Sequence, residues 1–370
     1  MTALKVLAFG AGVVIIAFTL LSAIRSTILP RAVNNRLGRL SIRVVLAGTH
    51  LWTGRSPSYE SRDRVMAMFG PMVLLVMLLS WLVLIIGAYI LIFLARGTGS
   101  VTKALELSGS SIFTLGTVPA HGLVNDLLSY SEAGIGLLLV TLLITYLPSI
   151  YSAFSRRENG VALLRVRAGT PPSAAAMLIR YHRIEGAGER LRGVWQTWES
   201  WFNDIEESHT SFPILAYFRS PQPTESWITA AGVVLDTASM WQAAVEHPTD
   251  PNVQLCIRAG FQALQRIADS LEIPYDDDPA PTDPITISRD EWDESVEEMA
   301  GAGVPIRDDR DDAWRAWKGW RVNYDTVLLD VARRVEAPPV PWVSDRSPLG
   351  HSPSRKLHRA RRVLSRGDSA

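Results

Sequence analysis

A polar stretch at residues 108–118 holds the side chains best suited to chemistry in this chain, and it reads Ser-Gly-Ser-Ser-Ile-Phe-Thr-Leu-Gly-Thr-Val. It lies between two strongly apolar segments. Irregular backbone at membrane depth survives only where it is buried in protein or lines an aqueous path. Backbone carbonyls and threonine hydroxyls can replace the water around a dehydrated cation. We therefore predict an ion filter for K⁺, Na⁺ or both, built from Thr114, Leu115, Gly116 and Thr117.

A short helix must position such a filter. Residues 102–113 are compatible with one, and Pro119 prevents its continuation. Its C-terminal, negative dipole end would then stabilise a cation near the membrane centre. We expect Thr114 at the inner end of an extended stretch and a positive φ at Gly116. The predicted supports of this pore helix are Ser108, Ser110 and Ser111.

Three apolar runs predict an all-α membrane protein, at residues 6–24, 71–95 and 133–151. Each is close to the length of about 20 residues that crosses a bilayer. The filter stretch would form a re-entrant loop between the second and third spans. The first run could instead be a cleaved signal peptide, because Lys5 precedes it. We favour a retained helix, since its apolar core is long and no A-x-A site follows.

Charge asymmetry predicts the orientation, although the chain has 37 basic and 37 acidic residues in total. Arginines crowd residues 25–64 and recur at Arg156, Arg157, Arg165 and Arg167, which favours the cytoplasmic side for both regions. The sequence thus predicts a multi-pass plasma-membrane protein with an outer N-terminus, an outer filter loop and a cytoplasmic C-terminal half.

The segment 31–46 has an amphipathic pattern. Leu37, Leu40 and Val44 share one helical face, whereas arginines 36, 39 and 43 share another. This pattern predicts a helix lying on anionic lipid. A solvated linker between spans is the alternative.

The residues around the filter resemble the pore module of tetrameric potassium-type channels. Ala104-Leu105-x-x-Ser108 is similar to that family's pore-helix pattern, and Thr114-Leu115-Gly116 follows at the matching distance. The resemblance covers residues 71–154 and implies a homotetramer. It also places a gating hinge at Gly134 or Gly136, and Pro148 could kink or end the inner helix.

The filter departs from the family's T-V-G-Y-G pattern at Thr117 and Val118. Valine takes positive φ only at a cost, so the outer carbonyl rings are not reproduced. The resemblance therefore implies a cation channel that is potassium-selective or weakly selective. The competing hypothesis is a non-conducting membrane scaffold or sensor whose C-terminal half binds a partner protein.

We predict an all-helical domain at residues 155–338. It follows the cytosolic segment 31–70 and the pore module 71–154, and it precedes a disordered basic tail at 339–370. The expected helices are 170–182 opened by Thr170-Pro171, 186–209, 224–246 capped by Thr224, 251–271 capped by Asp250, 288–299 with a Ser288–Glu291 capping box, and 310–336. Residues 1–30 form the N-terminal span. The tail could touch anionic lipid or the acidic region of a neighbouring subunit, or serve solubility alone.

Two tryptophan series, 195/198/201 and 314/317/320, recur on one helical face each and indicate core packing rather than ligand stacking. The acidic region 272–312 has no EF-hand spacing, which favours a solvated linker over a Ca²⁺ site. His182, His209, His247 and Cys256 have no metal-ligand spacing. No catalytic motif is present, so we predict no enzyme, no cofactor, no bound metal and no nucleic-acid partner.

Overall fold

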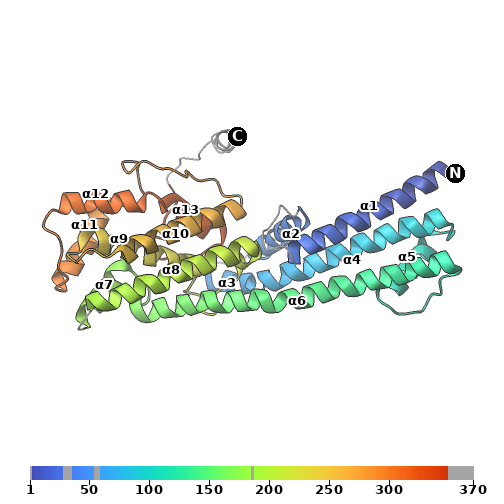
Figure 1. Ribbon diagram of the computed structural model, residues 1–370, viewed down its shortest axis with the longest axis horizontal. Coiled ribbons are helices and arrows are strands. Elements are labelled where there is room, and N and C mark those ends of the chain that lie inside the picture. The colour runs from blue at the N-terminus through green and yellow to red at the C-terminus, as the bar shows by residue number, and fades with distance from the viewer. Residues whose placement is uncertain (1, 28–35, 54–58, 185–186, 349–370) are drawn as a thin grey trace. The chain divides into compact units, whose positions relative to one another are not determined.

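The computed structural model describes residues 2–27, 36–53, 59–184 and 187–348. These residues form helices and no strand, apart from an isolated bridge between Val245 and Ile306. The chain divides into two compact units, residues 1–152 and 153–370, and Figure 1 shows their elements. Each unit is described by itself.

Three helices are long and apolar enough to cross a membrane, and they contain the three predicted apolar runs. They are α1 (Thr2–Thr27), α4 (Phe69–Arg96) and α6 (Leu123–Ala168). Helices α1 and α4 lie side by side (Figure 1). A Cβ added at Gly12 would lie 2.6 Å from Ile92 Cγ1, and Trp81 Nε1 donates to Ser22 Oγ at 3.4 Å. The two helices therefore pack closely and antiparallel.

Helix α2 (Arg36–Thr53) and α3 (Tyr59–Ala67) precede α4. Helix α2 packs on α4 and buries Ser41 and Val45, whereas Leu40 and Val44 are about half exposed, at 50% and 52%. The predicted amphipathic helix exists, and part of its apolar face has no protein cover in the described residues. Residues 31–35 of the predicted segment lie outside those that are described.

The helix that contains the third predicted span is longer than that span. Helix α6 begins at Leu123, well before the expected start at Ala133, and it continues through Pro148 to Ala168. Pro148 does not end the helix. Proline removes one backbone hydrogen bond, but the helix is continuous on either side of it.

The second unit contains α7 (Ala174–Arg183), α8 (Ala187–Ser211), the 3₁₀ turn η1 (Pro213–Tyr217), α9 (Trp227–Ala244), α10 (Pro251–Ser270), α11 (Arg289–Gly301), α12 (Arg310–Arg321) and α13 (Asp325–Arg334). Helix α9 is central, because it contacts α7, α8, α10, α12 and α13. Almost all of its residues are buried. A helix that is apolar on every side belongs in a core.

Local capping signals predicted some helix starts and missed others. Asp250 caps α10 by accepting from Asn252 N, and the capping box of Ser288 and Glu291 opens α11, both as predicted. The prediction for Thr170 was wrong: Ser173 caps α7. Pro172 follows Pro171 and disfavours helical backbone there. The cap of α9 is Ser226 rather than Thr224.

The predicted helix 310–336 is two helices. Helix α12 ends at Arg321 and α13 begins at Asp325. The Asn323 amide donates to the carbonyls of Gly319 and Trp320, which closes the end of α12. No Gly or Pro marks this break in the sequence.

The tryptophan prediction is confirmed for the first series, since Trp195, Trp198 and Trp201 are all buried. In the second series Trp317 is fully buried and Trp314 partly so. These two rings stack at 5.5 Å between centroids, and Trp317 also meets Trp342 at 5.6 Å. Trp320 is also partly buried, so both series serve packing in the second unit.

A buried ionic network links α9, α12 and α13. The Arg321 guanidinium donates to Asp236 at 2.5 Å, to Asp325 at 2.8 Å and to the Trp342 carbonyl at 2.6 Å. Tyr324 also donates to Asp236 at 2.9 Å. The two carboxylates raise the pKa of Arg321 although burial opposes this. A buried cation persists only with such pairing.

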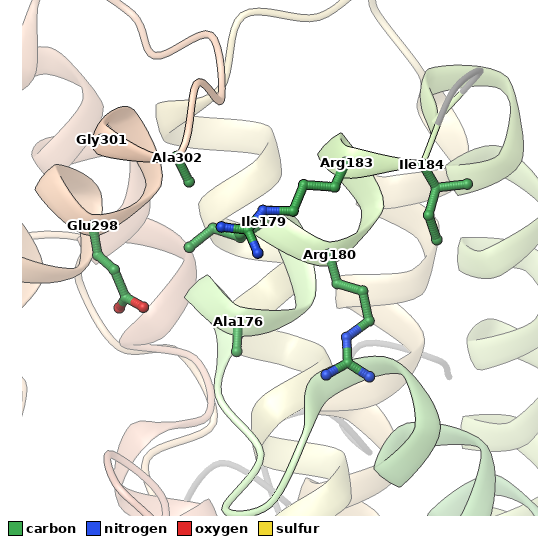
Figure 2. A pocket seen from close by; sticks show the side chains of 8 residues that line it. All are labelled: Ala176, Ile179, Arg180, Arg183, Ile184, Glu298, Gly301 and Ala302. Atoms are coloured by element: carbon green, nitrogen blue, oxygen red, sulfur yellow. The ribbon is translucent and has the colours of Figure 1, made fainter.

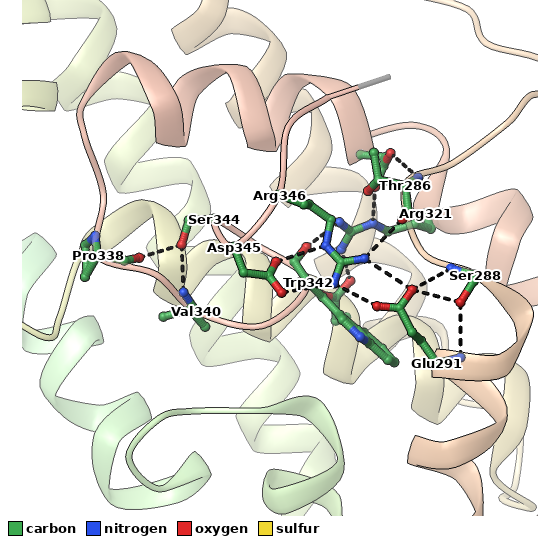
Figure 3. A network of polar contacts seen from close by, with 12 residues as sticks. Thr286, Ser288, Glu291, Arg321, Pro338, Val340, Trp342, Ser344, Asp345 and Arg346 are labelled. Carbon is green, nitrogen blue, oxygen red and sulfur yellow. Dashed lines mark hydrogen bonds and ion pairs between the residues drawn. The ribbon is translucent and has the colours of Figure 1, made fainter. Parts of the chain in front are cut away.

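Residues 339–348 are not a disordered tail, which corrects the prediction for this part. Val340 and Val343 are buried, and Arg346 binds Glu291 of α11 at 2.9 Å and the Thr286 carbonyl at 3.1 Å (Figure 3). The segment is predicted as a disordered tail because it is basic, but burial of its apolar side chains holds it in place. Residues 349–370 lie outside the described part.

The acidic region 272–312 is a linker only in part. Asp290 and Glu291 stand in the first turn of α11, and Asp311 and Asp312 in that of α12. Acidic residues there favour the helix dipole. Within the described residues no group of three or more His, Cys, Asp or Glu side chains could hold a metal ion.

Candidate functional site

Helix α5 (Val101–Ile112) lies between α4 and α6 and is fastened by buried serines. The Ser108 hydroxyl donates to the Glu132 carboxylate on α6 and lies 3.5 Å from the Ile86 carbonyl on α4. The Ser111 hydroxyl is 2.5 Å from that of Ser129 on α6. Ser108 and Ser111 thus contact the two flanking helices from one short helix.

Ser110 has a different partner. Its hydroxyl accepts from the Val118 backbone N–H at 3.1 Å and from the Thr117 hydroxyl at 3.3 Å. Ser110 therefore fastens the end of the loop to α5. Each of the three predicted support residues therefore forms a hydrogen bond with a different residue.

The C-terminal end of α5 lies alongside the long helices rather than beyond their ends. Ile86 is ten residues from the end of α4, or about 15 Å along it. A Cβ added at Gly136 would lie 2.6 Å from the Ile112 carbonyl oxygen. Gly136 is thirteen residues into α6, or about 20 Å.

The Thr-Leu-Gly segment follows directly and turns sharply. Thr114 and Gly116 have φ of 53° and 65°, so the predicted positive φ at Gly116 is confirmed. Thr114 is left-handed rather than extended, which corrects that expectation. Its N–H donates to the Ser111 carbonyl, and the Leu115 N–H donates to that of Ser110, both at 2.9 Å.

The predicted filter residues are exposed within the single chain. Thr114, Leu115, Gly116 and Thr117 all reach the surface, with Leu115 64% exposed. Their backbone is held from behind by Ser110 and Ser111. The segment is therefore a surface loop with fixed ends.

Glu132 is a site residue that sequence reasoning missed. It is fully buried, and its Oε2 has no hydrogen-bond partner among the described residues. A third span that starts at Ala133 places Glu132 in the outer loop. A carboxylate next to an apolar run is costly in a membrane and marks a functional or structural contact. The position of Glu132 beside the apolar run is the sequence signal that could have identified it.

A second polar contact lies one residue away in sequence. The Tyr89 hydroxyl on α4 is 2.7 Å from the Ser131 hydroxyl on α6. With the contacts of Ser108 and Ser111 it forms a polar layer that joins α4, α5 and α6. Such a layer orients α5 more strictly than apolar packing would.

The predicted hinge residues differ in their surroundings. Gly136 touches Ile112 as described, whereas a Cβ at Gly134 would meet nothing within 4 Å. Pro148 lies inside a continuous helix. Their role in gating stays a prediction, but only Gly136 has a packing reason to be glycine.

In the first unit, α6 exposes apolar side chains over several turns. They are Leu137, Leu138, Val140, Ile144 and Leu147. Thr145 also lies exposed, and its hydroxyl bonds the Thr141 carbonyl of its own helix at 3.1 Å. This surface is too apolar for water and fits lipid or further protein.

In the second unit, the buried side chains of His209 and Cys256 lie outside the ionic network. His209 Nδ1 lies 2.8 Å from the Ile205 carbonyl, and its ring is 4.5 Å from that of Trp227. Burial lowers the pKa of His209, and Arg157 lowers it further. Burial raises the pKa of the Cys256 thiol, so neither side chain is poised for nucleophilic chemistry.

The described helices define the class of this protein: an all-helical membrane protein with three candidate spanning helices. The chain is similar to YdjJ, an uncharacterized membrane protein of Bacillus subtilis (strain 168). The two are 24% identical over 251 residues, which cover 61% of this chain and 68% of the relative. No protein-family model and no solved structure matches the chain.

Proposed function

We propose that this protein is an oligomeric cation channel of the plasma membrane. In this proposal Thr114, Leu115, Gly116 and Thr117 face the ion path and K⁺ or Na⁺ passes between copies of the chain. One observation carries the proposal: an exposed, sharply turned Thr-Leu-Gly segment follows a short helix whose end lies beside Gly136 of an apolar helix.

Electrostatics favours a cation at this place. The C-terminal end of α5, with its partial negative charge, ends at Ile112 just before Thr114. Between Ala104 and Tyr130 the chain contains Glu106 and Asp126 and no lysine or arginine. A loop of this charge raises the local concentration of cations.

Several copies of the chain are needed, because one Thr-Leu-Gly segment cannot surround an ion. Cyclic symmetry is the usual way to close a ring, and the resemblance to potassium-type channels implies a homotetramer. The apolar surface of α6 supplies area for contacts between copies. Accordingly, α6 is the pore-lining helix in this proposal.

Orientation and lipid contact complete the proposal. The outer side carries the N-terminus and the loop 97–122, and the second unit is cytoplasmic. On α2 the exposed Leu40 and Val44 lie in the same helix as the exposed Arg43. This combination suits the surface of an anionic bilayer.

The decisive experiment compares two glycine variants in planar bilayers. Gly116 and Gly122 both have positive φ, 65° and 89°, and a Cβ at either would meet nothing within 4 Å. Alanine strains the backbone about equally at both positions, at about 1 kcal/mol. We expect Gly116→Ala to change conductance or the K⁺/Na⁺ permeability ratio, whereas Gly122→Ala conducts like the wild type.

Two outcomes would contradict the channel. One is the absence of single-channel currents from purified wild-type protein under every voltage, pH and lipid condition tried. The other is equal behaviour of both variants in conductance and selectivity. A folded but silent protein would favour the scaffold hypothesis.

A further inference from the structure

The second unit has a cavity of about 580 Å³ between α7 and α11 (Figure 2). Ala176, Ile179, Arg180, Arg183 and Ile184 line it from α7 and its C-terminal end, and Glu298, Gly301 and Ala302 from the end of α11. Small-molecule sites commonly have volumes of about 300–1,000 Å³ with mostly apolar walls and a few polar groups. The volume of this cavity falls in that range, and its walls are about half polar and half apolar.

Opposite charges face this cavity without neutralising each other. The side chains of Arg183 and Glu298 make no hydrogen bond or ion pair in the part of the chain that is described, although both line the same space (Figure 2). Arg180 also lines this space, and its guanidinium is turned away from Glu298 (Figure 2) and donates to the Val166 carbonyl at 2.5 Å. The cavity therefore presents a cationic side and an anionic side.

The helix ends strengthen the anionic side. Helix α11 ends at Gly301, which lines the cavity next to Glu298. The C-terminal end of a helix carries about half a negative charge and favours cations. On the other side, arginine is the side chain best matched to a carboxylate.

We propose that this cavity binds the zwitterion of an α-amino acid with an apolar side chain. The carboxylate accepts hydrogen bonds from Arg183 and Arg180. The ammonium lies at Glu298 and the carbonyl end of α11. The apolar side chain packs against Ile179, Ala176 and Ala302.

Arg180 connects this site to the end of α6. Val166, whose carbonyl it binds, lies in the last turn of α6, and Arg167 donates to the Tyr181 hydroxyl of α7 at 2.7 Å. A carboxylate that engages Arg180 competes with Val166 and loosens α7 from α6. This step rests on the proposed function: through this contact the amino acid acts as a gating ligand of the channel.

The test titrates full-length protein in detergent with three matched compounds by calorimetry. L-leucine carries both charges, 4-methylpentanoate lacks the ammonium, and 3-methylbutylamine lacks the carboxylate. We expect leucine to bind at least about tenfold more tightly than either analogue, because each analogue leaves one charged contact unmade. Equal binding of 4-methylpentanoate and leucine would overturn the zwitterion site.

Three variants test the carboxylate contact and the ammonium contact separately. Arg183→Gln should weaken leucine by at least about tenfold and spare 3-methylbutylamine. Glu298→Gln should weaken leucine but not 4-methylpentanoate. Arg258→Gln, at an exposed arginine on α10, should bind leucine like the wild type.

Failure of the site and failure of the channel give different results. No leucine binding by correctly folded protein, down to a Kd of about 1 mM, overturns the site even if currents are seen. Leucine binding with the expected variant pattern but without currents supports the site and contradicts the channel. If both hold, leucine should change open probability in wild-type protein and not in Arg183→Gln.

Discussion

Glu132 and Arg321 are both buried charged residues, but they differ in how completely their polar atoms are hydrogen-bonded. Arg321 has three hydrogen-bond acceptors around its guanidinium, and its role is to hold α9, α12 and the chain at Trp342 together. Glu132 has Ser108 on one oxygen and no described partner on the other. A buried carboxylate with one unpaired oxygen costs stability. A role in positioning α5 behind the proposed filter therefore explains Glu132 better than a role in stabilising the fold.

The first prediction concerns Glu132. Glu132→Gln keeps the volume and an oxygen that accepts from Ser108, and we expect a near-wild-type melting temperature. Glu132→Leu removes the acceptor, which should cost about 1–3 kcal/mol, loosen α5 and alter the permeability ratio. Thermal melts in detergent and bilayer recordings measure both effects.

The control is Glu106→Leu, at an exposed position of α5. It removes a carboxylate from the same helix without touching α6. If Glu132→Leu melts like Glu106→Leu, Glu132 does not position the helix.

At the scale of elements, the contact between α5 and α6 depends on one glycine. Gly136→Ala would push a methyl group to 2.6 Å from the Ile112 carbonyl, and we expect a loss of about 1–3 kcal/mol from overpacking. Gly134→Ala meets open space and gains the same helix propensity of about 1 kcal/mol. Comparing the two variants by thermal melting isolates the contact.

If both alanine variants are equally stable, α5 does not pack on Gly136 in solution. If Gly134→Ala instead changes gating while stability is kept, the hinge assignment belongs to Gly134. Recordings on both variants distinguish these cases.

The packing of residues 339–348 on α11 should depend on pH. The hydrogen bond from Arg346, helped by Ser288, lowers the pKa of Glu291 from 4.5 to about 2 in the folded protein. A depressed folded pKa adds stability that is present above the unfolded value and is lost as pH falls through the folded value. This contribution should therefore disappear between pH 4.5 and pH 2.

Calorimetric melts of the full chain across that range measure the effect. We expect the wild-type melting temperature to fall more steeply than that of Glu291→Gln. Glu294→Gln, at an exposed position of α11, should follow the wild type. Parallel curves for all three proteins would mean that the ion pair does not contribute.

At the scale of the whole molecule, the proposed channel requires association. In the first unit α6 leaves an apolar surface that no described residue covers. We expect native mass spectrometry in mild detergent to show a tetramer of the 40.8 kDa chain. A protein that stays monomeric in several detergents and in lipid nanodiscs would contradict the ring of filters.

The predictions from sequence succeeded where the signal is local. Asp250 followed by Pro251 and Ser288 followed by Glu291 each mark a helix start with side chains only a few residues apart. They failed at residues 322–324 and at 339–348, where the outcome depends on partners far along the chain. Asp236, which binds Arg321, is 85 residues away.

By itself the sequence determined three apolar helices, a polar Thr-Leu-Gly stretch between two of them and a helical second half, because length, periodicity and capping act over a few turns. Only the tertiary structure decided that Glu132 is buried against Ser108, that Gly136 rather than Gly134 receives α5, and that Arg346 holds the C-terminal segment. The reason is physical: burial and pairing depend on which surfaces meet, and chain neighbours do not specify that.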